Sequence, residues 1–234
     1  MFKRILVALP CFVALACSAD KSSSDASDTE RTDSVEEAEA DSPAQDSDAG
    51  DTGDAGETAS LSSADLVGQW ESPVCEAYDD GAGGTNYLTR DFTLSASSWN
   101  LVFTVFGDEG CTYPLFSGEI DGAYTLTGPS TSVAGAVEGE FGFEQVAWTA
   151  HDPGIADFLT SSSCGAEAWE VGVAQDVSET GCIGVAHPVA ECPAEYDLVA
   201  LEDGQLFFGE RITNMCAPEG RPAALVAYGL ESAG

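Results

Sequence analysis

Apolar and polar residues alternate along short segments of the chain beyond residue 62. In the clearest segment, 99–106, Trp99, Leu101, Phe103 and Val105 occupy alternate positions. Side chains two apart leave a strand from the same face, so this pattern predicts β-strands. Further strands are expected at 92–94, 139–143, 170–174, 196–201 and 205–208, separated by clusters of Gly, Pro, Asp and Ser. With one weak helix candidate, 152–159, the pattern predicts an all-β sandwich or antiparallel barrel.

Two of these segments, 101–106 and 206–208, are apolar on both strand faces. In a barrel without a second layer, one of the two apolar faces lines the interior. Barrels of about eight strands or more can hold a small ligand. The alternative is that the inward side chains simply fill the core.

The N-terminus has the features of an export signal. A basic start, Met-Phe-Lys-Arg, precedes an apolar run over 5–16 that is too short to span a bilayer. Small residues before Cys17 fit a bacterial lipoprotein signal of residues 1–16, with Cys17 as the lipidated residue. Ser18, rather than Asp, follows it, which favours delivery to the outer membrane or cell surface. The alternative is an ordinary cleavage site with an incidental cysteine.

Residues 17–62 are expected to form a disordered acidic tether. Ser, Asp, Glu, Ala, Thr and Gly dominate the segment, and it contains no aromatic residue. Such a composition buries too little apolar surface to offset the entropy of ordering. The acidic repeat at 48–57 is better explained as a solvated spacer than as a calcium site.

Residues 63–234 are expected to form one domain with an unusual charge balance. The chain has 41 acids and seven bases; 14 of the acids and four of the bases precede this domain, leaving 27 acids and three bases. The three bases are Arg90, Arg211 and Arg221. This balance argues against nucleic acid or anionic lipid headgroups as partners.

Six of the eight cysteines lie in this domain, at positions 75, 111, 164, 182, 192 and 216. An even number in an exported domain predicts disulfides, for which the sequence alone leaves the pairing open. Zinc is the weaker alternative, because no Cys-x-x-Cys pair exists and only His151 and His187 are available.

A series of ordered motifs runs through residues 64–230, including Trp70-x-Ser-x-x-Cys75-Glu76 and Cys164-Gly-Ala-Glu…Trp169…Gly…Gln-Asp-Val177. This series resembles the adenomatosis polyposis coli down-regulated (APCDD) domain of animal Wnt antagonists. The resemblance implies an antiparallel β-barrel with an apolar cavity that recognises a lipidated ligand through its acyl chain. This chain differs in having a single domain, two additional cysteines and a bacterial anchor, so a Wnt protein is not assumed as partner.

The resemblance also implies how the cysteines pair. Four of them, Cys75, Cys111, Cys164 and Cys182, lie at motif positions of the family. The two additional ones, Cys192 and Cys216, are therefore expected to pair with each other. Sequential pairing predicts Cys75–Cys111, Cys164–Cys182 and Cys192–Cys216.

Gly68-x-Trp70 is similar to the first-strand motif of lipocalins, in which a tryptophan closes one end of the barrel beneath an arginine. Arg90 lies in an otherwise apolar strand, 88–94, and a buried charge without a partner is costly. We therefore expect Arg90 to be buried against an acid, with Glu76 as the first candidate. The alternative is a surface arginine in an acidic field.

A ligand cavity is predicted from aromatic residues that share strand faces: Trp99, Phe103, Phe141, Phe143 and Phe207. The predicted ligand is a hydrophobic small molecule or acyl chain. The alternative function is a surface module that contacts proteins or envelope polymers through a filled barrel. His151 and His187 lie in loop-like settings and no catalytic or phosphate-binding motif occurs, so neither an enzyme, a cofactor nor a metal site is predicted.

Overall fold

The computed structural model describes residues 61–79, 84–182, 186–211 and 214–234. The predicted signal, Cys17 and nearly all of the predicted tether lie outside these residues. The strands are β1 (Gly68–Glu71), β2 (Glu76–Asp79), β3 (Thr85–Leu94), β4 (Ser98–Phe106), β5 (Pro114–Pro129), β6 (Val137–Gly142), β7 (Gln145–Ala150), β8 (Ala174–Asp176), β9 (Ala194–Glu202), β10 (Gln205–Phe208) and β11 (Glu231–Ser232). The helices are α1 (Ser63–Leu66), α2 (Pro153–Ser161) and the 3-10 turn Pro218–Gly220.

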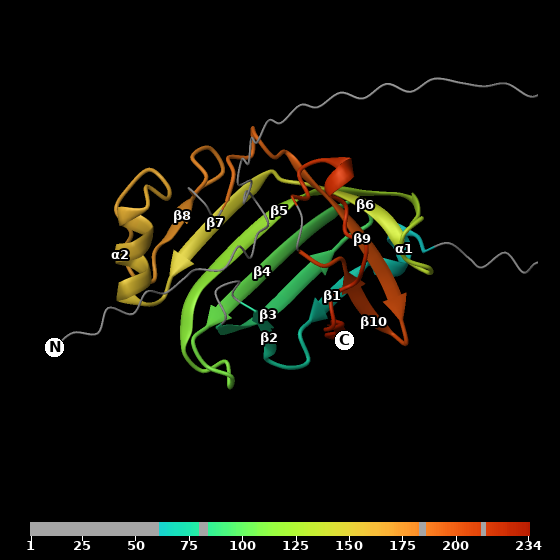
Figure 1. Ribbon diagram of the computed structural model, residues 1–234, viewed down its shortest axis with the longest axis horizontal. Helices are drawn as coiled ribbons and strands as arrows, with labels where there is room; N and C mark the ends of the chain where they lie inside the picture. The colour runs from blue at the N-terminus through green and yellow to red at the C-terminus, as the bar shows by residue number, and fades with distance from the viewer. Residues whose placement is uncertain (1–60, 80–83, 183–185, 212–213) are drawn as a thin grey trace, which may run out of the picture. The chain divides into compact units, whose positions relative to one another are not determined.

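The strands form one antiparallel sheet that curls into a nearly closed barrel. Its order is β10-β9-β6-β5-β4-β3-β1-β11. Leu230, just before β11, exchanges backbone hydrogen bonds of 2.8 and 2.9 Å with Leu206 of β10, which brings the two ends of the sheet together. The predicted all-β, disulfide-bonded barrel is therefore confirmed (Figure 1).

The long strand β5 is shared between two partners on one of its edges. Residues 116–121 of β5 pair with β7, whereas residues 124–129 pair with β6. The sheet therefore branches at the turn between β6 and β7. One branch continues through β9 and β10 to complete the barrel, and the other ends at β8.

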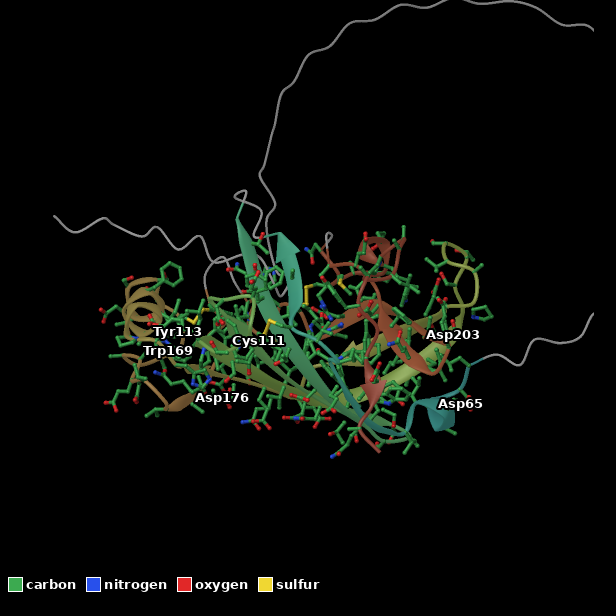
Figure 2. All side chains as sticks on the ribbon, turned by 90° about the horizontal axis from the view of Figure 1, so that it is seen from below. Asp65, Cys111, Tyr113, Trp169, Asp176 and Asp203 are labelled. Atoms are coloured by element: carbon green, nitrogen blue, oxygen red, sulfur yellow. A yellow bond between two sulfur atoms is a disulfide. The ribbon has the colours of Figure 1, made fainter. Side chains whose placement is uncertain are left out.

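The β7–β8 branch carries the main helix. Asp152 caps α2 by accepting hydrogen bonds from the backbone N–H groups of Gly154 and Ile155, at 2.7 and 3.2 Å. Beyond the helix, the indole of Trp169 donates a 2.7 Å hydrogen bond to the carbonyl of Cys164. Trp169 and Asp176 lie at this end of the domain, away from Asp65 and Asp203 (Figure 2).

The side chains of β4 alternate as the sequence predicted. Trp99, Leu101, Phe103 and Val105 are buried, and the residues between them are partly exposed or intermediate. The hairpin between β9 and β10 turns at Asp203 and Gly204, which both have positive φ. This turn matches the Asp-Gly signal in the sequence, because such residues adopt positive φ at low cost.

One expected strand was misplaced and the longest one was not predicted. Most of 170–174 forms a turn, and β8 begins only at Ala174. Strand β5 lacks a clear apolar alternation in the sequence because glycines, Gly118 and Gly122, occupy two of its inward positions. At Gly118, a Cβ atom would clash with the ring of Phe103, so that ring fills the space a side chain would otherwise need.

Three disulfides have the pairing expected from the sequence: Cys75–Cys111, Cys164–Cys182 and Cys192–Cys216. The zinc alternative is therefore wrong for these cysteines. Disulfides persist in oxidising compartments, which indicates an extracellular or secreted domain. Among the described residues, no helix has both the length and the apolar character needed to cross a membrane.

Candidate functional site

The barrel encloses a cavity of about 410 Å³. Strands β2, β3, β4, β5, β9 and β10 contribute to its wall, together with the turn after β6, the segment after β10 and the segment before β11. The lining residues are Glu76, Ala77, Tyr78, Leu88, Arg90, Phe92, Trp99, Leu101, Phe103, Ile120, Phe143, Glu195, Phe208, Gly209, Glu210, Arg211, Val226, Ala227 and Tyr228. Most of the wall is therefore apolar, with charged side chains gathered on one part of it.

Three of the five predicted ligand residues line this cavity: Trp99, Phe103 and Phe143. Phe141 is buried but is not part of the cavity wall. Its ring stacks on Tyr124 at 5.4 Å and meets Trp99 edge-on at 5.5 Å, so it supports the wall from behind.

The prediction for Phe207 is wrong, because the neighbouring residue Phe208 faces inward. Phe208 is buried and its ring lies 4.4 Å from that of Phe92, whereas Phe207 is only partly buried. Both residues are phenylalanine, so the alternation of residue types could not fix the register of this short strand. A shift of one residue exchanges the two faces of a strand.

The one polar atom of the Trp99 side chain, its indole nitrogen, has a hydrogen-bond partner outside the cavity wall. The N–H of Trp99 donates a 2.9 Å hydrogen bond to the carbonyl of Gly142. The ring can therefore face the cavity without an unpaired polar atom. Phe92, Leu101 and Phe208 complete the apolar surface around it.

Trp70 is buried but does not line the cavity. It is opposite Phe92 in the register of β1 and β3, and its indole donates a 2.9 Å hydrogen bond to the carbonyl of Leu66 in α1. Gly68, with φ of +151°, allows the chain to enter β1 from α1. Both residues of the Gly68-x-Trp70 motif thus have structural roles.

The predicted pair of Arg90 and Glu76 is confirmed. The Nε and Nη2 atoms of Arg90 both lie 3.0 Å from Oε1 of Glu76. Ser72 donates a further hydrogen bond of 2.5 Å to the same oxygen, and Arg90 donates one of 2.9 Å to the carbonyl of Tyr228. Burial lowers the pKa of Arg90, the charge of Glu76 opposes that effect, and the charge of Arg211 adds to it.

Arg211 is the centre of a second ionic group. No pattern in the sequence predicted this group. The Nη1 atom of Arg211 lies 2.5 Å from Oε2 of Glu195, and its Nη2 lies 3.5 Å from Oδ2 of Asp197. Burial raises the pKa of Asp197 to about 6, although the charge of Arg211 acts in the opposite direction. The sequence feature that could have indicated this group is the small number of bases. An arginine that is buried inside so acidic a domain is expected to pair with a carboxylate.

The C-terminal segment before β11 completes the wall next to these charges. Val226 donates a 2.9 Å backbone hydrogen bond to Phe208, and Ala224 accepts one of the same length from Glu210. Tyr228 then contacts Arg90 through its carbonyl, as described above. The charged part of the cavity is therefore held between β2, β3, β9 and this segment.

No metal site accompanies the cavity among the described residues, where no group of three or more His, Cys, Asp and Glu side chains is arranged to hold an ion. His151 lies 2.9 Å from the hydroxyl of Ser117, and neither residue lines the cavity. The polar groups of the cavity are chiefly paired with one another. The site can therefore enclose an apolar molecule and present polar groups to one part of it.

A family model described as "Adenomatosis polyposis coli down-regulated 1" matches residues 52–181. This match covers more than half of the chain, including β1 to β8, the disulfide Cys75–Cys111 and the first cysteine of the disulfide Cys164–Cys182. The chain belongs to the APCDD family. The resemblance inferred from the motifs is thus confirmed, with one APCDD domain in this chain. Strands β9 and β10, Arg211 and the additional disulfide follow the matched residues.

Proposed function

We propose that this APCDD protein is a lipid-anchored, extracytoplasmic binding module whose barrel encloses the apolar chain of a lipid. The observation that carries the proposal is the cavity inside the barrel, with Phe92, Trp99, Leu101 and Phe208 in its wall. Its volume of about 410 Å³ lies within the range of roughly 300–1,000 Å³ that is usual for small-molecule sites.

An apolar ligand suits this wall for a physical reason. An empty cavity lacks atoms on one side of each lining group, so the aromatic rings forgo dispersion contacts. An acyl chain would restore those contacts and remove its own apolar surface from water, at about 25 cal/mol for each Å² buried. Cavity surface lined by apolar side chains, as around Phe92, Trp99 and Phe208, accepts apolar guests.

A non-catalytic role is part of the proposal. Catalysis requires a free nucleophile or base aimed at a reacting atom. The charged groups of the cavity instead pair with one another, Arg90 with Glu76 and Arg211 with Glu195. Such pairs orient and hold a ligand more readily than they transfer a proton.

The proposed anchor rests on the sequence, since residues 1–17 lie outside the described part of the chain. The export signal of 1–16 ends at Cys17, and the acidic segment that follows suits a spacer between membrane and barrel. We propose attachment to the bacterial outer membrane or cell surface. Mass spectrometry of the N-terminal peptide should find acyl chains on Cys17, and Cys17→Ser should release the protein from membranes.

Lipid binding can be tested by titrating the delipidated protein with a fluorescent acyl ester. The wild type should bind the ester saturably, and Phe103→Asp should abolish binding because the carboxylate enters the apolar wall. Thr104→Asp is the matched control, because it adds the same charge to the next residue of β4, which does not line the cavity. Absence of saturable binding by the wild type, or equal loss in both folded variants, would reject the proposal.

A further inference from the structure

The charged part of the cavity exposes its guanidinium groups more than its carboxylates. The side chains of Arg90 and Arg211 are 13% and 26% exposed, whereas those of Glu76 and Glu195 are 5% and 4% exposed. Asp197 is 2% exposed and lies behind Arg211. A ligand that reaches this region therefore meets N–H donors first and carboxylate acceptors hardly at all.

The charges of this region nevertheless sum to a negative value. Three buried carboxylates, Glu76, Glu195 and Asp197, surround two guanidinium groups. One oxygen of Glu195, Oε1, is buried without a hydrogen-bond partner. Both arginines are thus already neutralised, and no unbalanced positive charge is available for a further anion.

We infer that the polar end of the ligand is uncharged and accepts hydrogen bonds, as an ester carbonyl does, and that it lies against Arg90 and Arg211. This inference rests on the proposed function and names the ligand class for the same cavity. A free carboxylate would be desolvated beside a region that is already net negative, and an ammonium group would meet the exposed guanidinium groups. An ester carbonyl avoids both costs and still receives N–H donors.

The test compares three ligands that share one apolar chain: methyl laurate, laurate and laurylamine. Each displaces the fluorescent acyl ester from the delipidated wild-type protein, at a pH above the value of about 6 at which Asp197 ionises. Methyl laurate should bind at least about tenfold more tightly than laurate, which is the effect of one unbalanced charge at roughly 10 Å in a protein environment. It should also bind more tightly than laurylamine, because the ammonium group of laurylamine would face the exposed guanidinium groups of Arg90 and Arg211.

Glu195→Gln tests the cause of this preference. The variant removes one of the three carboxylates but keeps an oxygen that can accept the hydrogen bond of Arg211. The preference for methyl laurate over laurate should shrink several-fold. Glu202→Gln is the matched control, because it removes the same charge from an exposed position at the other end of β9 and should leave the preference unchanged.

The outcomes separate the two proposals. If none of the three ligands binds, the proposed function fails. If laurate or laurylamine binds as tightly as methyl laurate, the function stands and the inference about the polar end is overturned. If Glu195→Gln and Glu202→Gln change the preference equally, the buried carboxylate is not its cause and the inference fails as well.

Discussion

Single charged residues inside the barrel depend on close partners. Arg90 projects from β3 between the inward residues Leu88 and Phe92, so its guanidinium has little access to water. Glu76 and the carbonyl of Tyr228 supply its hydrogen bonds. This single side chain therefore ties β2, β3 and the C-terminal segment together.

Replacing Arg90 by Met should lower the free energy of unfolding by about 3–5 kcal/mol, because Glu76 would remain buried without its partner. Chemical denaturation of the wild type and the variant measures the loss. The double variant Glu76→Gln/Arg90→Met should recover part of it, since the unpaired charge is then gone. A loss below about 1 kcal/mol for Arg90→Met, the size typical of surface ion pairs, would contradict a buried role.

Asp197 should make stability depend on pH. Because its folded-state pKa of about 6 lies above the ordinary value of 3.8, the folded domain binds its proton more readily than the unfolded chain does. This group therefore stabilises the fold as pH falls from above 6 towards 4, and that contribution disappears as pH rises through 6.

The comparison of wild type with Asp197→Asn isolates this contribution from those of the other acids. Between pH values on either side of 6, the stability of the variant should change less than that of the wild type. Denaturation curves across this range provide the measurement. The same pH dependence in both proteins would show that Asp197 does not titrate there.

At the level of elements, the disulfide Cys192–Cys216 fixes the hairpin of β9 and β10. It joins Cys192, two residues before β9, to Cys216 in the segment beyond β10, at a sequence separation of 24. Glu195 and Arg211 both lie within this loop. The bond therefore constrains the elements that carry the second ionic group of the cavity.

Replacing both Cys192 and Cys216 by Ala should destabilise the domain by about 3–4 kcal/mol, because the unfolded chain gains the freedom of the opened loop. Thermal and chemical unfolding under oxidising conditions measure the change. The affinity for the acyl ester should fall as well, since Glu195 and Arg211 lose a constraint. Unchanged stability would mean that the hairpin is held by its sheet partners alone.

The sequence was informative where one strand face is clearly apolar. The alternation in β4 predicted its buried side chains, and the Asp-Gly pair predicted the turn after β9. It was uninformative where glycine replaces an apolar residue, as at Gly118 in β5, because the space is filled by a ring from the neighbouring strand. Adjacent phenylalanines at the end of β10 likewise hid the correct register.

Of the two ionic groups in the cavity, one could be predicted from the sequence and the other could not. Arg90 and Glu76 were predictable, because an arginine in an apolar strand requires an acid and Glu76 follows a motif cysteine. The partners of Arg211 were not, because they come from β9 and from the chain beyond β10, and only the closed barrel brings them together. Long-range closure through Leu206 and Leu230 leaves no local pattern in the sequence.

At the scale of the whole molecule, the domain combines a strongly acidic composition with a largely apolar interior. The domain has 27 acids and three bases, and all three bases form ion pairs with carboxylates. Inside, aromatic rings surround a cavity of about 410 Å³. We propose that an acyl chain occupies this cavity beside Trp99.

Quenching of tryptophan fluorescence by a methyl ester with a brominated acyl chain tests that claim most directly. Trp99 lines the cavity, whereas the other three tryptophans, Trp70, Trp148 and Trp169, do not. Saturable quenching in the wild type should be largely lost in Trp99→Phe, which keeps an aromatic ring in the wall and should still bind the ester. Quenching that is absent in the wild type, or that persists unchanged in Trp99→Phe, would contradict the placement of the chain in the barrel.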